Sequence, residues 1–128
     1  MIESGNQAPF ARRLGFELSA VGEGWAEFTG VTSDDLYNPN GSVHGGFAAA
    51  LLDSAMGCAI HTMLKDGAGY TTIELKINYI RAMFADTGRV TARGDVIHVG
   101  RRTATADGRL TDERGRLIAH GSTTCLIL

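Results

Sequence analysis

The chain has 128 residues, enough for one domain with a hydrophobic core, and we expect residues 1–128 to form that single domain. The formal net charge is −2 at pH 7 and the sequence pI is about 6.0, which excludes the broadly basic surface of nucleic-acid-binding proteins. The opening residues lack the basic and then apolar pattern of a secretory signal. Two cysteines, Cys58 and Cys125, lie in apolar runs typical of buried, reduced thiols. The sequence therefore predicts a cytoplasmic protein.

The first third of the chain predicts short elements and a long loop. Residues 8–14 resemble one short helical turn. Residues 15–21 and 25–31 flank a tight Gly-Glu-Gly connection, which predicts a β-hairpin. Residues 32–43 are rich in Ser, Asp, Asn, Pro and Gly and predict a loop, and loops of this length are usually functional.

Residues 45–64 predict a helix that is apolar on nearly every face. Their length also suits a membrane span. However, Asp53 lies near the middle, where an acid costs about 2.5–3.5 kcal/mol on insertion scales, and five alanines with three glycines make the segment only weakly hydrophobic. We therefore expect a soluble protein, with no membrane partner, in which other parts of the chain surround this helix.

The residues after this helix predict strands. Residues 72–79 alternate strictly, with Ile73, Leu75, Ile77 and Tyr79 on one face and Thr72 on the polar face opposite. Residues 90–99, 102–111 and 117–128 follow, joined by turn-like segments. One face of the last two strands carries small residues that would let a helix lie close: Ala104, Ala106, Gly108, Ala119 and Gly121. The predicted fold class is α+β, with one antiparallel sheet of about six strands wrapped around a long central helix.

Two features of the helix predict chemistry. Asp53 is a carboxylate in the middle of a buried helix, where Asp is rare without a partner. Gly45 and Gly46 open the first turn and leave backbone N–H groups at the positive end of the helix dipole. The alternative for Asp53 is that a neighbouring hydroxyl simply satisfies it. The alternative for the glycines is that they only allow a tight junction between loop and helix. Together the two features predict an oxyanion site and a base.

The motif Asn38-Pro-Asn-Gly-Ser-Val-His44-Gly45-Gly46, followed by Ala-Ala-Ala-Leu-Leu-Asp53, resembles the hotdog-fold acyl-CoA thioesterases of the phenylacetate-degradation type. The similarity extends through residues 70–80 and the last three strands, so it covers essentially the whole chain. The spacing from His-Gly-Gly to Asp is its most specific part. This resemblance implies the hotdog fold and a thioester hydrolase.

The resemblance also implies roles for individual residues. Asp53 would activate water or attack the thioester carbonyl, and the Gly45 N–H would polarise that carbonyl. His44 would shape the turn, and Asn38 would help to hold thioester and water. Thr72, supplied by the partner subunit, would position water near the acid.

The substrate is expected to contact further residues. The resemblance places the phosphates of coenzyme A at the hairpin containing Gly100, Arg101 and Arg102. Adjacent arginines are suited to bidentate contacts with phosphate. The alternative is that the two arginines are a solvated pair of charges at a turn. Some relatives carry a hydroxyl one turn after the acid, where this chain has Gly57, and that space would enlarge the acyl pocket. The remaining expected substrate-binding residues lie along the same helix: Gly46, Phe47 and Met56.

The predicted function is hydrolysis of an aryl- or medium-chain acyl-CoA to the acid and coenzyme A. No cofactor is expected, and the spacing of the four histidines predicts no metal site. The alternatives are a hotdog hydratase or dehydratase of 3-hydroxyacyl thioesters and a non-catalytic acyl-CoA-binding module. The long strand at 71–80 predicts a homodimer, and the resemblance implies a dimer of dimers, a homotetramer.

Overall fold

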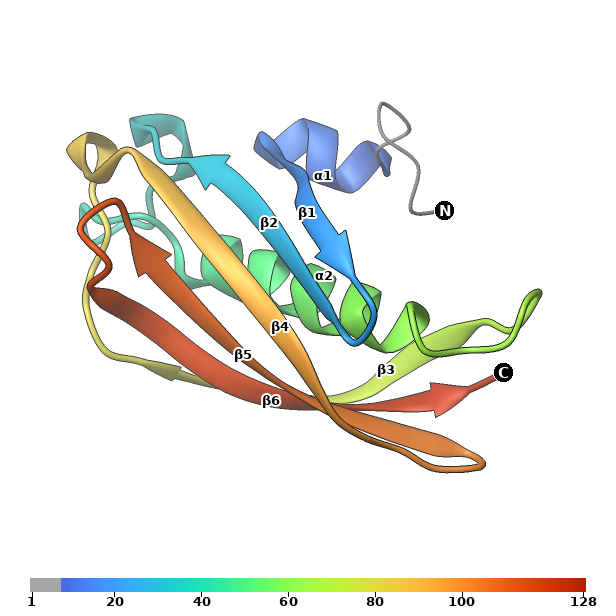
Figure 1. Cartoon of the computed structure of the whole chain (residues 1–128). Coiled ribbons are helices and arrows are strands. Elements are labelled where there is room, and N and C mark those ends of the chain that lie inside the picture. The colour runs from blue at the N-terminus through green and yellow to red at the C-terminus, as the bar shows by residue number, and fades with distance from the viewer. Residues whose placement is uncertain (1–7) are drawn as a thin grey trace.

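The computed structural model describes residues 8–128. It contains one six-stranded antiparallel sheet, two α-helices and two short 3₁₀ helices, and Figure 1 shows the sheet curving around the longer helix. In chain order the elements are α1 Pro9–Leu14, β1 Phe16–Gly22, β2 Trp25–Val31, η1 Asp34–Leu36, α2 Gly45–His61, β3 Tyr70–Tyr79, η2 Ala85–Thr87, β4 Arg89–Val99, β5 Thr103–Asp112 and β6 Leu117–Ile127.

The strands are ordered β1-β2-β4-β5-β6-β3, with every neighbouring pair antiparallel. The predicted fold class is therefore confirmed, as are the hairpin and the short first helix. The central helix ends three residues earlier than expected, at His61. Both β1 and β3 are edge strands, so β3 pairs with β6 on one side only.

Helix α2 is enclosed by the sheet, and seven of its residues have no exposed surface: Ala48, Leu51, Leu52, Ala55, Met56, Ala59 and Ile60. Glycines in the sheet allow this close approach. A Cβ atom at Gly94 of β4 would lie 2.5 Å from the Ala55 carbonyl oxygen and 2.7 Å from the Met56 Cα. A Cβ atom at Gly108 of β5 would lie 2.9 Å from the Met56 side chain. The backbone of α2 therefore packs directly on β4. None of the helices in residues 8–128 is long and apolar enough to cross a membrane.

Strand β3 does not follow the strict alternation expected from its sequence. Thr72 pairs with Cys125 and Glu74 pairs with Thr124, so Ile73 is an extra residue in a β-bulge. The bulge exchanges the two faces of the strand. As a result Thr72, before the bulge, and Ile77, after it, both face α2 and the core. The prediction that Thr72 lies on the face opposite Ile77 is therefore wrong.

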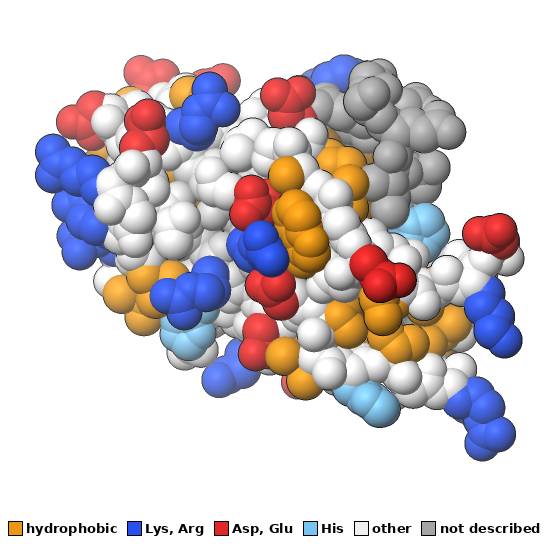
Figure 2. All heavy atoms as spheres, in the orientation of Figure 1, with side chains coloured by type: hydrophobic (Ala, Val, Ile, Leu, Met, Phe, Trp, Pro, Cys, Tyr) orange, Lys and Arg blue, Asp and Glu red, His pale blue; other side chains and the backbone are white. Residues whose placement is uncertain are grey.

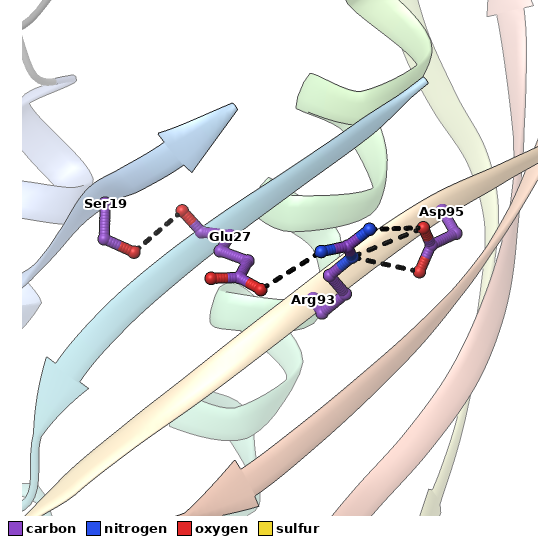
Figure 3. Close-up of polar contacts among 4 residues, drawn as sticks. All are labelled: Ser19, Glu27, Arg93 and Asp95. Carbon is purple, nitrogen blue, oxygen red and sulfur yellow. Dashed lines mark hydrogen bonds and ion pairs between the residues drawn. The ribbon is translucent and has the colours of Figure 1, made fainter. Parts of the chain in front are cut away.

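The other face of the sheet is polar and carries charges of both signs, as Figure 2 shows. At its centre Arg93 of β4 contacts Glu27 of β2 at 3.3 Å and Asp95 at 3.1 Å (Figure 3). The Arg93 guanidinium also lies 4.3 Å from the centre of the Trp25 ring. Exposed pairs of this kind contribute little stability. The fold therefore depends on the inner face, where α2 is buried.

The contact between Gly94 and α2 gives a prediction. Gly94→Ala should destabilise the protein by about 1–3 kcal/mol, because the new Cβ meets helix backbone that has no rotamer to change. Chemical denaturation measures the difference. Gly69→Ala is the matched control, because a Cβ there meets only Leu128 at 3.8 Å, and equal stability of the two variants would contradict this account of the packing.

Candidate active site

The start of α2 offers one free backbone donor. The His44 Nδ1 atom accepts a hydrogen bond from the Gly46 N–H at 2.7 Å and so caps the helix. Within residues 8–128 the Gly45 N–H has no acceptor. The structure thus leaves the Gly45 N–H unpaired among the described residues. The expectation that Gly46 also donates to a ligand is wrong, because His44 occupies its N–H.

Asn38 organises the loop that leads into the helix. Its Oδ1 atom accepts from the backbone N–H groups of Asn40 and Ser42, and its Nδ2 atom donates to the Ser42 hydroxyl at 3.2 Å. This is the self-bonding turn that Asn favours in loops. Asn38 therefore fixes the shape of the loop as well as lying beside the helix start.

A cavity of about 460 Å³ opens at the start of α2. Four predicted site residues line it, namely Asn38, His44, Gly45 and Gly46. Residues outside the predicted site also line it, from the end of β3 and the segment that follows: Tyr79, Ile80, Arg81, Ala82 and Met83. The Tyr79 hydroxyl donates to the Gly45 carbonyl at 2.7 Å. In the sequence, the apolar and basic residues at the end of this strand were the available signal for this part of the cavity.

Asp53 lies further along α2, beside the first half of β3. The Thr72 hydroxyl donates to the Asp53 Oδ1 atom at 2.9 Å within the same chain. The expectation that a partner subunit supplies Thr72 is therefore wrong, and the bulge at Ile73 is the physical reason, because it leaves Thr72 facing the chain's own helix. The hydroxyl leaves Asp53 Oδ2 for other partners.

Gly57, one turn after Asp53, does not enlarge a pocket. A Cβ atom there would lie 2.9 Å from the Tyr70 ring and 3.0 Å from the Tyr70 hydroxyl oxygen. The Tyr70 ring therefore fills the space beside Gly57, and that expectation is wrong. Burial raises the pKa of Tyr70 to about 12, and the neighbouring Cys58, Cys125 and Asp53 act in the same direction, so this phenol stays protonated.

The two cysteines are not activated nucleophiles. Burial raises the pKa of Cys58 to about 11 and also raises that of Cys125, which lies 3.8 Å from the Thr72 hydroxyl. A nucleophilic cysteine needs a lowered pKa. Both are free thiols, as expected.

Phe47 and Met56 were expected to contact substrate, but the structure places both in the core. Phe47 is 3% exposed and packs edge-on against Phe16, with ring centres 6.5 Å apart. Met56 has no exposed surface and lies against Gly108. Their side chains point to the sheet because α2 is apolar on all faces and the sheet encloses it.

The predicted phosphate residues lie at the tip of the β4–β5 hairpin, which projects from the body in Figure 1. Arg101 and Arg102 are exposed, and neither forms an ion pair with another described residue. The Arg102 carbonyl accepts from the Ile127 N–H, and Ile127 pairs with Tyr70 across β6 and β3. The hairpin therefore lies at the same end of the sheet as Tyr70 and far along α2 from Gly45.

The predicted site is thus divided into two halves within one chain. Gly45, His44 and Asn38 line the cavity at the helix start, whereas Asp53 and Thr72 do not. Eight residues separate Gly45 from Asp53, about 12 Å along the helix axis. A carbonyl group held by the Gly45 N–H is therefore out of direct reach of Asp53 in the same chain.

Comparison with known proteins identifies the family. Residues 40–119 match the model of the thioesterase superfamily. This chain belongs to the thioesterase superfamily. The matched range contains both the helix start and Asp53, and the prediction of a thioester-hydrolase fold and family is confirmed.

Individual relatives agree with this assignment. The acyl-coenzyme A thioesterase PaaI of Escherichia coli is 28% identical over 110 residues, 85% of this chain and 75% of that protein. A Haemophilus influenzae protein provisionally named an esterase is 34% identical over 88 residues, 69% of this chain, and the match spans 62% of that protein's length. This chain therefore aligns with less than two thirds of that relative.

Solved structures share the fold along nearly the whole chain. The conserved protein PA5202 of Pseudomonas aeruginosa superposes with a TM-score of 0.88 at 32% identity, covering 95% of both chains. A mutant form of the phenylacetic acid degradation protein PaaI of Thermus thermophilus superposes with a TM-score of 0.85 at 33% identity, covering 94% of this chain and all of that one. The resemblance to the PaaI type that the sequence indicated is confirmed.

Proposed function

We propose that the protein is an acyl-CoA thioesterase in which Asp53 drives hydrolysis. The observation that carries the proposal is the Asp53–Thr72 pair on a buried helix whose first N–H, at Gly45, is free among the described residues. The reaction takes R–CO–S–CoA and water to R–COOH and CoA–SH. A thiolate is a good leaving group, so a carboxylate and an oriented N–H donor suffice without metal or cofactor.

In this proposal Asp53 acts as the base. Thr72 occupies its Oδ1 atom and fixes the carboxylate orientation, which leaves Oδ2 to take a proton from water or to attack the carbonyl itself. The Gly45 N–H, at the positive end of the helix, stabilises the oxygen that becomes negative in the tetrahedral intermediate. An aryl or medium-chain acyl group suits the apolar part of the cavity wall formed by Ile80 and Met83.

We propose that the two halves of the site meet in a homodimer. Edge strand β3 and the residue after it expose Ile73, Leu75, Tyr79 and Ile80, with 57%, 37%, 55% and 58% of their surfaces open. A second copy of β3, antiparallel across a two-fold axis, covers this edge.

The direction of this pairing decides what comes together. Thr72 of β3 contacts Asp53, and Tyr79 at the other end contacts Gly45. Antiparallel pairing sets the Tyr79 end of one strand beside the Thr72 end of the other. It therefore brings Gly45 of one subunit toward Asp53 of its partner, and each dimer gains two composite sites. Two such dimers would give the expected tetramer.

Replacing the acid tests the proposed activity. Asp53→Asn should lower kcat by at least about 10²-fold with little change in KM, because the carboxylate acts in the transition state. Release of free thiol from a panel of acyl-CoAs measures the loss. Near-normal turnover by the variant would remove Asp53 from the mechanism, and absence of thiol release by the unmodified protein would favour a non-catalytic acyl-CoA-binding module.

The hairpin arginines give a second prediction. Arg101→Ala/Arg102→Ala should raise KM for acyl-CoA and leave the same acyl group on a short thiol without a nucleotide almost unaffected. Because the arginines are exposed, the difference should shrink as salt concentration rises. Arg114→Ala, in the turn at the other end of the strands, is the control. Equal losses with both substrates would make the arginine pair structural.

The composite site gives a third prediction. Gly45→Pro removes the N–H at the first helical position, where Pro is tolerated. Gly45→Ala keeps the N–H and brings the same Cβ close to the Tyr79 ring. We expect Gly45→Pro to be much less active than Gly45→Ala in the thiol-release assay.

Co-expression of Gly45→Pro with Asp53→Asn should then recover up to about a quarter of normal turnover, because half of the dimers carry one intact composite site. Asp53→Asn with Thr72→Val should recover none, because these residues lie in the same half-site. Recovery by the second pair alone, or full activity of a monomer by light scattering, would refute the composite site.

A further inference from the structure

We infer that the Tyr70 hydroxyl is an additional hydrogen-bonding group of the active site, which contacts the attacking water or the thioester beside Asp53. The inference rests on the proposed function and adds a residue to it. It is carried by the position of the phenol, which fills the notch at Gly57 on the same side of the sheet as the Asp53–Thr72 pair.

Tyr70 and Thr72 share one face of β3, because they are two residues apart and both precede the bulge. Thr72 contacts Asp53 directly, and Tyr70 contacts the helix one turn further on, at Gly57. Positions 53 and 57 are neighbours on the helix surface, with Cβ atoms about 5–6 Å apart. Since the phenol oxygen lies 3.0 Å from the position of a Cβ at Gly57, it lies within about 9 Å of the Asp53 Cβ. The phenol oxygen and the Asp53 carboxylate therefore border the same space beside the helix, and the inferred water or thioester oxygen lies there.

The hydroxyl is available for such a contact. Within residues 8–128 it has no hydrogen-bond partner, although its ring packs against α2. The ring lies against the backbone at Gly57 and beside the His61 ring, with 5.5 Å between the two ring centres. A phenol whose ring is packed and whose oxygen has no partner among the described residues can donate to a ligand or water.

Gly57 is necessary for this arrangement. Any side chain at position 57 would collide with the Tyr70 ring, whose nearest carbon lies 2.9 Å from the Cβ position. A side chain at position 57 would therefore displace the phenol of Tyr70 from this space. A hydroxyl introduced at position 57 can therefore be tested as a replacement for the phenol of Tyr70.

Tyr70→Phe removes the oxygen and keeps the ring in the notch. We expect kcat for acyl-CoA hydrolysis to fall about tenfold, with KM and the melting temperature nearly unchanged. Thr71→Val is the matched control, because Thr71 is the exposed neighbour on the opposite face of the strand. Turnover of Tyr70→Phe within about twofold of the unmodified protein would overturn the inference.

The exchange experiment separates a chemical role from a packing role. Tyr70→Val empties the notch, and Gly57→Ser or Gly57→Ala in that background then refills it with or without a hydroxyl. We expect the Ser variant to recover turnover and the Ala variant not to, at equal thermal stability. Equal activity of the two would show that Tyr70 only packs. Failure of the proposed function gives a different result from failure of the Tyr70 inference: the unmodified protein then releases no thiol, or Asp53→Asn retains its turnover.

Discussion

The structure depends on one constraint, the burial of a helix that is apolar on nearly every face. Such a helix has little surface to give to water, so the sheet must curl around it and supply small residues where the two backbones meet. Gly94 and Gly108 meet that need, and the Ala55 and Met56 backbone lies against the glycine of β4. Because this contact is between backbones, the helix is held in one axial position. Its first turn and its middle, which carry Gly45 and Asp53, are thereby fixed relative to every strand.

A buried helix also explains why its polar groups are prominent. Away from the core, the carboxylate of Asp53 would be one of many solvated acids. Here it faces a strand, and the Thr72 hydroxyl satisfies one of its oxygens. At the helix start the His44 ring caps one N–H and leaves the adjacent one free among the residues that the structure describes. Both features follow from local hydrogen bonding that the packing enforces, and both are chemically useful to a thioesterase.

The bulge in β3 connects the fold to the chemistry. One extra residue, Ile73, turns Thr72 and Tyr70 toward the helix and lets Ile77 do the same on the other side of the bulge. In a strand without the bulge, Thr72 and Ile77 would point to opposite faces of the sheet, and only one of them could face the helix. The strand can therefore serve the site with its first half and the core with its second, while its free edge remains open for a second subunit.

The sequence by itself determined the fold class, a curled sheet around one helix, because a helix apolar all round and strands with small residues admit few other arrangements. Its motif around the helix start indicated the family. It also indicated Asp53 and Gly45, since an acid in an apolar helix and glycines at its start are local signals. Only the tertiary structure decided which side of β3 Thr72 faces, because a one-residue bulge leaves no mark in an alternating pattern. It likewise decided that Phe47 and Met56 are core residues and that Tyr70 fills the notch at Gly57. Those outcomes depend on which of several apolar faces meets the sheet, and on contacts between residues far apart in the chain, which periodicity cannot specify.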